Sequence, residues 1–71
     1  MCRSIQRLRG PEGIATDDEI HAAALQFVRK VSGFRAPSQR HEEAFDAAVH
    51  EIADTSRRLL ESIAARQAQR A

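Results

Sequence analysis

Thr16-Asp17-Asp18-Glu19 begins the stretch that decides the fold, and Gly33 ends it. The Thr16 hydroxyl can accept a hydrogen bond from the Glu19 amide while the Glu19 side chain accepts one from the Thr16 amide, as in a capping box. Gly33 stands where helices place a left-handed C-cap. We therefore expect a first helix over residues 17–32. Apolar residues at helical spacing define one face of it: Ile20, Ala24, Phe27, Val28 and Val31.

A second, longer helix is expected over residues 38–68. Pro37 keeps the residue before it out of helical geometry, and Ser38 is a favourable N-cap. Residues spaced alternately by four and three form the seam typical of a packed helix or coiled coil: Phe45, Val49, Ile52, Ser56, Leu59 and Ile63. Three more apolar residues widen this stripe: Ala48, Ala53 and Leu60.

These patterns predict an all-α fold, an antiparallel helical hairpin that forms one small domain over residues 1–71. A short link makes the helices antiparallel, and the first is only about half as long as the second at 1.5 Å per residue. The first helix therefore leaves the distal half of the second without cover, around Leu59, Leu60 and Ile63. Residues 66–71 are expected to fray.

Two alternatives can cover this distal half of the long helix. Residues 1–15 are expected to be an irregular arm, because Gly10, Pro11 and Gly13 break any long helix. Ile5 and Leu8 can fold that arm over the long helix. The alternative cover is the same surface of a second subunit. A chain of 71 residues with one cysteine has a marginal core and no internal disulfide, so we expect a homo-oligomer or a protein partner.

Composition favours the cytoplasm. The net charge of +1 gives no general attraction to nucleic acid or to an anionic membrane. No apolar run approaches the roughly 20 residues of a membrane span, and the basic start lacks the apolar segment of a secretory signal. A single thiol stays reduced in the cytoplasm.

The start of the chain is a candidate thiol site. Cys2 follows the initiator Met1, and a residue this small usually allows the methionine to be removed. The mature chain would then carry an amine and a thiol on adjacent carbons, which can chelate a metal or react as a nucleophile. Arg3 and Arg7 favour the reactive thiolate. The alternative is an unreactive side chain packed against the long helix.

The link between the helices is a candidate anion site. Helix N-termini bind phosphates and carboxylates, arginine adds bidentate donors, and Phe34 offers a stacking face for a base. The alternative is structural, with cations that offset the dipole of the first helix and Phe34 packed on the turn. The proposed anion-binding residues are Arg29, Lys30, Arg35, Ser38 and Arg40.

A third constellation is a weak metal candidate. Asp46, His50 and Asp54 follow one another at single-turn spacing, and Cys2 is a further conceivable ligand. Ligands on one exposed helix face hold a metal weakly, so we assign no metal and no other cofactor. No acid pair, serine triad or Cys-x-x-Cys motif can be assembled from the sequence, which favours a function other than catalysis.

Several segments of the chain resemble one family of small bacterial proteins: Met1-Cys2-Arg3-Ser4-Ile5, Ala15-Thr16-Asp17-Asp18-Glu19-Ile20, Ala22-Ala23-Ala24-Leu25-Gln26-Phe27-Val28-Arg29-Lys30-Val31-Ser32-Gly33-Phe34 and Pro37-Ser38. That family is catalogued as domain of unknown function 2277. The resemblance covers nearly the whole chain and departs at Gly10-Pro11-Glu12-Gly13-Ile14, where the usual pattern has an aromatic residue and paired prolines. It implies no established activity, but it points to the Cys2 start and to the basic link.

Three functions follow from these patterns. The leading hypothesis is a small helical binding or adaptor module that self-associates. The first alternative is thiol or metal chemistry at a processed Cys2. The second is binding of RNA or another polyanion through the basic link.

Overall fold

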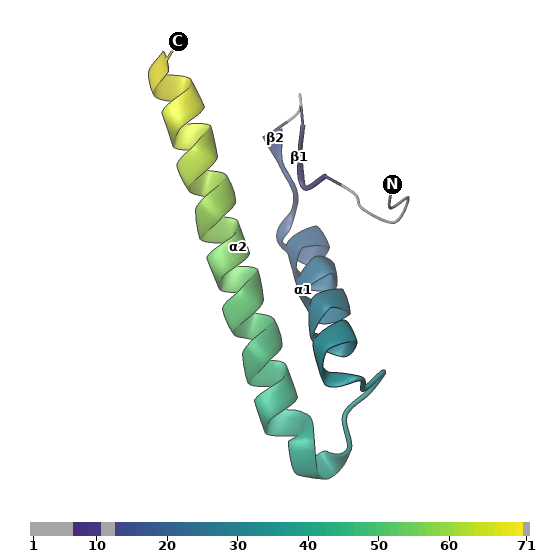
Figure 1. Cartoon of the computed structure of the whole chain (residues 1–71). Helices are drawn as coiled ribbons and strands as arrows, with labels where there is room; N and C mark the ends of the chain where they lie inside the picture. Colours follow the sequence, from purple (N-terminus) through teal and green to yellow (C-terminus); the bar gives the residue numbers. More distant parts are fainter. Residues whose placement is uncertain (1–6, 11–12, 71) are drawn as a thin grey trace.

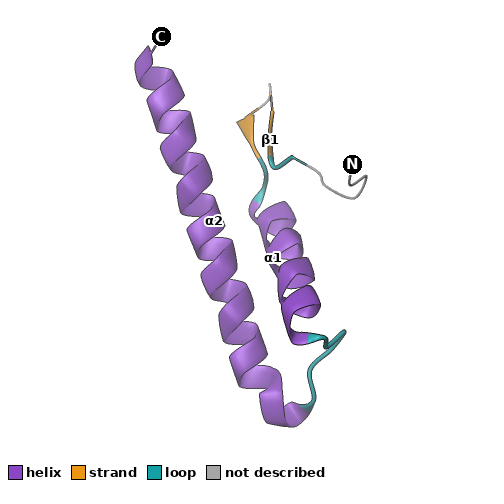
Figure 2. Ribbon diagram, viewed as in Figure 1, coloured by secondary structure: helices purple, strands orange, loops and turns teal. Residues whose placement is uncertain are grey.

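The computed structural model describes residues 7–10 and 13–70, and two antiparallel helices dominate it (Figure 1). Helix α1 spans Asp17–Ser32 and helix α2 spans Glu42–Arg70. A short 3-10 helix, η1, spans Gln39–His41 and leads into α2. Figure 2 shows that loops and two very short strands make up the rest. The predicted helical hairpin is therefore confirmed.

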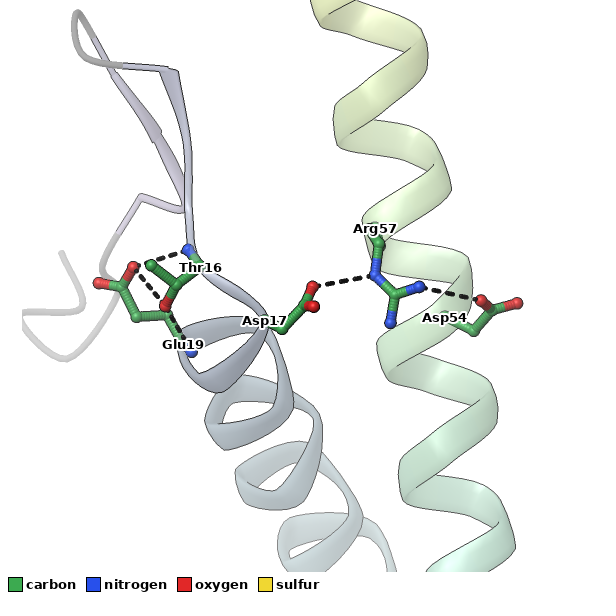
Figure 3. Close-up of polar contacts among 5 residues, drawn as sticks. All are labelled: Thr16, Asp17, Glu19, Asp54 and Arg57. Atoms are coloured by element: carbon green, nitrogen blue, oxygen red, sulfur yellow. Dashed lines mark hydrogen bonds and ion pairs between the residues drawn. The ribbon is translucent and has the colours of Figure 1, made fainter.

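Helix α1 has the ends that its sequence predicts, and Figure 3 shows the N-terminal one. The Thr16 hydroxyl accepts a hydrogen bond from the Glu19 N–H at 3.2 Å, and the Glu19 carboxylate accepts one from the Thr16 N–H at 2.9 Å. Gly33 adopts the left-handed conformation, with φ 80°, and its N–H donates to the Arg29 carbonyl at 2.9 Å. Both ends satisfy backbone groups that a helix otherwise leaves free.

The start of α2 differs from the prediction. Ser38 precedes η1, but its hydroxyl makes no capping hydrogen bond. Instead, the Ser38 carbonyl accepts from the His41 N–H at 2.9 Å, so the chain turns once as a 3-10 helix before α2 begins at Glu42. Glu42 and Glu43 then place two carboxylates in the first turn of α2, where the helix dipole favours negative charge.

The core lies along the contact between α1 and α2. Ile20 is the most deeply buried residue, and it belongs to the first turn of α1. Partly buried residues pack around this core from both helices and from the segment before α1. The buried residues are Ile20, Ala24, Val28, Phe45, Val49, Ala53 and Leu60. Those that pack around them are Leu8, Ala15, Leu25, Ala48 and Ile52.

The buried face of α2 is turned away from the expected seam. Ala53 and Leu60, expected only to widen the stripe, are buried, whereas Leu59 is 60% exposed. Phe45, Val49 and Ala53 are spaced by four residues, so the contact line drifts around α2 relative to a strict seven-residue repeat. The exposure of Leu59 agrees with the expectation that the first helix leaves it without cover, whereas Leu60, expected in the same uncovered half, is buried.

The segment before α1 forms a small antiparallel hairpin instead of an irregular arm. Strand β1 spans Arg9–Gly10 and pairs with strand β2, Gly13–Ile14. Beside this pair, the Ala15 N–H donates to the Leu8 carbonyl at 2.7 Å. Strand β2 lies against α2 beyond the end of α1 (Figure 1). The arm thus folds over the long helix as predicted, whereas Ile5 lies outside the described residues.

The two helices form a single layer. The structure measures 49 × 27 × 16 Å along its principal axes. Among the described elements, only the β-hairpin and η1 accompany the two helices, so no further described helix packs over either face of the layer. Helix α2 continues to Arg70, and fraying of residues 66–71 stays a prediction. Neither described helix is both long and apolar enough to cross a membrane.

Candidate binding groove

An apolar groove lies between α1 and α2 at the end where the link joins them. Its volume is 290 Å³. Its lining is almost wholly apolar, and the side chains of Ser32 and His41 are its polar members. The groove is lined by Phe27, Val28, Val31, Ser32, Phe34, His41, Ala44, Phe45, Ala48 and Ile52.

Helix α1 contributes the most exposed apolar side chains of the groove. Phe27 is 53% exposed and Val31 is 69% exposed, although Val28 between them is buried against α2. The three residues lie on adjacent turns, so burial of Val28 turns the other two toward the groove side of the layer. Phe27 and Val31 were expected on the core face, and their exposure corrects that expectation.

Helix α2 contributes the opposite wall. Ala44 and Ala48 are one turn apart, and Ile52 follows Ala48 by one further turn. The two alanine side chains are too short to fill the space beside α1, which leaves the groove open. Phe45 forms its floor, since this ring is buried and also lines the groove.

The link closes one end of the groove through an aromatic pair. The Phe34 ring stacks on the His41 ring, with centroids 5.5 Å apart and planes inclined by 22°. The Phe34 N–H donates to the Ser32 hydroxyl at 3.1 Å, which holds the backbone of the link close to the end of α1. Because Phe34 is 38% exposed, one part of its ring remains available at the groove.

The predicted anion site is organised as a structural link. Arg29 Nε donates to the Arg35 carbonyl at 2.8 Å, so one of its donors holds the link in place. Lys30 and Arg40 are exposed on either side of the link, and the Ser38 hydroxyl makes no capping hydrogen bond. The structure therefore brings Arg29 and Arg35 together through a backbone carbonyl, and anion binding by the five residues stays a prediction.

The predicted metal residues are also placed by backbone and ion-pair contacts. The His50 Nδ1 lies 3.0 Å from the Asp46 carbonyl oxygen, and the Asp54 carboxylate is 3.4 Å from Arg58. Among the described residues, no group of three histidine, cysteine or acidic side chains is arranged to hold a metal. Of the predicted thiol site, Cys2 and Arg3 lie outside the described residues, and Arg7 is exposed.

Ion pairs of Arg57 lie on the side of α2 away from the groove (Figure 3), since Arg57 follows the groove residue Ala48 by nine residues, about 180° around the helix. Arg57 Nε lies 3.2 Å from the Asp17 carboxylate, without the alignment of a hydrogen bond, so charge attraction makes this link between the helices. The other end of the Arg57 guanidinium is 3.6 Å from Asp54. Nearby, the His21 and His50 rings meet edge to face with centroids 6.1 Å apart.

The groove itself was not predicted from the sequence. Its clearest signal was the pair Ala44 and Ala48, placed where the long helix begins to pack, because two small residues at that spacing leave room beside a helix. The second signal was Val31, an apolar residue in the last turn of α1, where the contact of α1 with α2 comes to its end. Neither signal predicts an open groove unless the way in which the two helices pack against each other is already known.

Comparisons with known proteins place the chain in a family. The model of a family described as an uncharacterized conserved protein, DUF2277, matches residues 1–71. Searches of curated proteins and of solved structures gave no match. Since the family model covers the full length, the resemblance drawn from the Cys2 start, the capping box and the link is confirmed. The chain belongs to the DUF2277 family of uncharacterized conserved proteins.

Proposed function

We propose that this chain is a small helical binding module that acts by holding an apolar helical surface of a protein in the groove between α1 and α2. The observation that carries the proposal is the composition of the groove. Its lining is apolar, and three of its large side chains are exposed: Phe27, Val31 and Phe34. Exposed apolar patches with polar surroundings are typical of interaction sites.

The shape of the groove supports a helix as its occupant. Ala44, Ala48 and Ile52 present a row at one-turn spacing, and Phe27 with Val31 presents a second row at the same spacing. Two parallel rows of this kind accept a helix whose own apolar side chains recur every three or four residues. The side away from the groove, with Asp17, Arg57 and Asp54, offers no comparable surface.

The alternatives expected from the sequence have less support from the described residues. Arg29 bonds the link, which reduces what the anion site can offer to a phosphate. Thiol chemistry at Cys2 concerns a residue outside the described part of the chain. We retain the cytoplasm as the proposed site of action, since a chain with one cysteine suits a reducing compartment.

Matched variants test this function. Val31→Glu places a carboxylate in the groove at a position that is 69% exposed, so the hairpin should still fold. Ala47→Glu is the control, because Ala47 is exposed and lies about 200° around α2 from the buried Phe45. A tag is placed at the C-terminus so that the start of the chain stays native.

The two variants and the wild type are used to capture proteins from a cell extract, and each captured protein is then purified and titrated by calorimetry. The expected result is a partner, either another protein or a second copy of the chain, that binds the wild type and the Ala47→Glu variant but binds Val31→Glu at least about tenfold more weakly. Partners that bind all three proteins equally, or the absence of any binding, would overturn the proposal.

A further inference from the structure

We propose that the occupant of the groove is a second copy of this chain, packed face to face so that two hairpins form a four-helix assembly. This inference rests on the proposed function, because it names the partner of the same groove. The copies are related by a two-fold axis, and each supplies Phe27 and Val31 to the groove of the other.

The surface area of the chain favours a second copy as the occupant of the groove. The chain exposes 6331 Å². A compact monomer of 7.9 kDa is expected to expose about 4400 Å², so the excess is roughly 1900 Å². Each partner of a standard protein interface buries about 800 Å². The chain as a whole thus exposes a surplus larger than the area that one partner buries in a standard interface.

The single layer explains where this surplus comes from. Domains are normally built from at least two packed layers around a core, whereas this molecule is 16 Å across its smallest dimension. A second hairpin laid on the groove face completes the missing layer. The seven buried residues of one copy would then be continued by the groove side chains of both copies.

The groove face is also complementary to itself. In a two-fold interface the same patch meets its own copy, so it must offer both projections and recesses. Phe27 and Val31 project from α1, and the short side chains of Ala44 and Ala48 leave a recess on α2. A projecting ring of one copy can therefore enter the recess of the other.

The charge of the groove face also allows two copies of the chain to pair. A charged patch placed against its own copy brings like charges together, which costs free energy. The groove lining contains no Asp, Glu, Lys or Arg, and His41 is its one titratable residue. The charged pairs of the described chain lie on the other face, around Asp17 and Arg57, where a second hairpin would not cover them.

The apolar stripe of α2 extends this surface beyond the groove. Leu59 follows Ile52 by seven residues, which is nearly two full turns, so both side chains lie on the same side of α2. Leu59 is 60% exposed in one hairpin. A second copy long enough to span the groove also reaches this residue, and its burial explains an apolar side chain that the hairpin leaves in water.

The experiment uses the full chain at its native start. Sedimentation equilibrium over a wide range of protein concentration measures the mass of the wild type, of Val31→Glu and of the control Ala47→Glu. We expect a dimer for the wild type and for Ala47→Glu, and a dissociation constant about tenfold higher or more for Val31→Glu. Circular dichroism of each variant at low concentration shows whether the hairpin is retained.

An isotope-filtered spectrum of mixed labelled and unlabelled chains then locates the interface. Contacts between the Phe27 ring of one copy and the methyl groups of Val31, Ala48 or Ile52 of another support the proposal. A monomer at every concentration overturns it, and if a different protein still binds the groove, the proposed function survives. A dimer whose affinity is unchanged by Val31→Glu also overturns the proposal, because association then uses another surface, and the capture experiment alone then decides whether the proposed function survives.

Discussion

Phe34 and His41 stack across the link, with ring centroids 5.5 Å apart, and this pair joins the end of α1 to the start of α2. The stack lies at the closed end of the groove, where both residues belong to the lining. It therefore couples the geometry of the link to the shape of the binding surface.

The first prediction concerns this stack. Replacing Phe34 with alanine should lower the free energy of unfolding by about 1 kcal/mol, because an aromatic pair contributes about 0.5–1.5 kcal/mol beyond the area that it buries. A double-mutant cycle with His41→Ala, followed by urea unfolding, measures the coupling between the two rings. Additive effects of the two substitutions would show that the stack contributes no stability of its own.

The capping box gives the second prediction. Thr16→Ala should cost about 1 kcal/mol, because it leaves the Glu19 N–H without its acceptor at the start of α1. Thr16→Ser is the matched control and should stay close to the wild type, since serine retains the hydroxyl. Thermal unfolding followed by circular dichroism makes the comparison. Equal losses for both variants would assign the effect to the methyl group instead.

Gly33 gives the third prediction. Its φ of 80° is one that side chains rarely adopt, and a Cβ placed there would meet nothing within 4 Å. Gly33→Ala should therefore cost about 1–2 kcal/mol through backbone strain alone. Gly33→Asn should cost less, because asparagine tolerates this conformation better. If alanine proved as stable as glycine, the end of α1 would have to differ from the one described.

The fourth prediction separates two neighbouring leucines. Leu60 is 7% exposed and Leu59 is 60% exposed, so Leu60→Ala should cost about 2 kcal/mol or more, and Leu59→Ala at least about 1 kcal/mol less. Both changes are made in the Val31→Glu background, where the chain is expected to be monomeric. Chemical unfolding gives the two values. A larger loss of unfolding free energy for Leu59→Ala than for Leu60→Ala would show that Leu59 lies on the packed face of α2, as the sequence pattern predicts.

The fifth prediction concerns the ion pair between the helices. Asp17→Asn should lower the free energy of unfolding by about 0.5 kcal/mol, because the side chains of Asp17 and Arg57 are 80% and 40% exposed and water screens their attraction. The loss should shrink when unfolding is repeated at high salt. A loss that is independent of salt would point to a different role for Asp17 at the start of α1.

The helices and their order could be read from the sequence because local chemistry determines them. Thr16, Glu19 and Gly33 act through the backbone within a few residues, so their roles do not depend on tertiary contacts. The exact face of α2 could not be read in the same way. A pattern that includes both Leu59 and Leu60 is compatible with two rotations of the helix, and only the packing of α1 selects one.

The groove was still harder to foresee. Phe27 and Val31 have the spacing of core residues, and they are exposed because Ala44 and Ala48 do not reach them. The β-hairpin was missed for a different reason. Two strands of two residues each are too short to give an alternating pattern from which a strand could be predicted.

The link that carries Phe34 has a consequence for how such a protein can diversify. This one short connection joins the two walls of the groove, and residues 33–38 set the distance between the walls at that end. A change of length or sequence at residues 35–38 alters the width of the groove, provided that the Gly33 cap and the Phe34 stack are kept. A chain built in this way can therefore acquire a new specificity through a loop segment while both helices and their core stay intact.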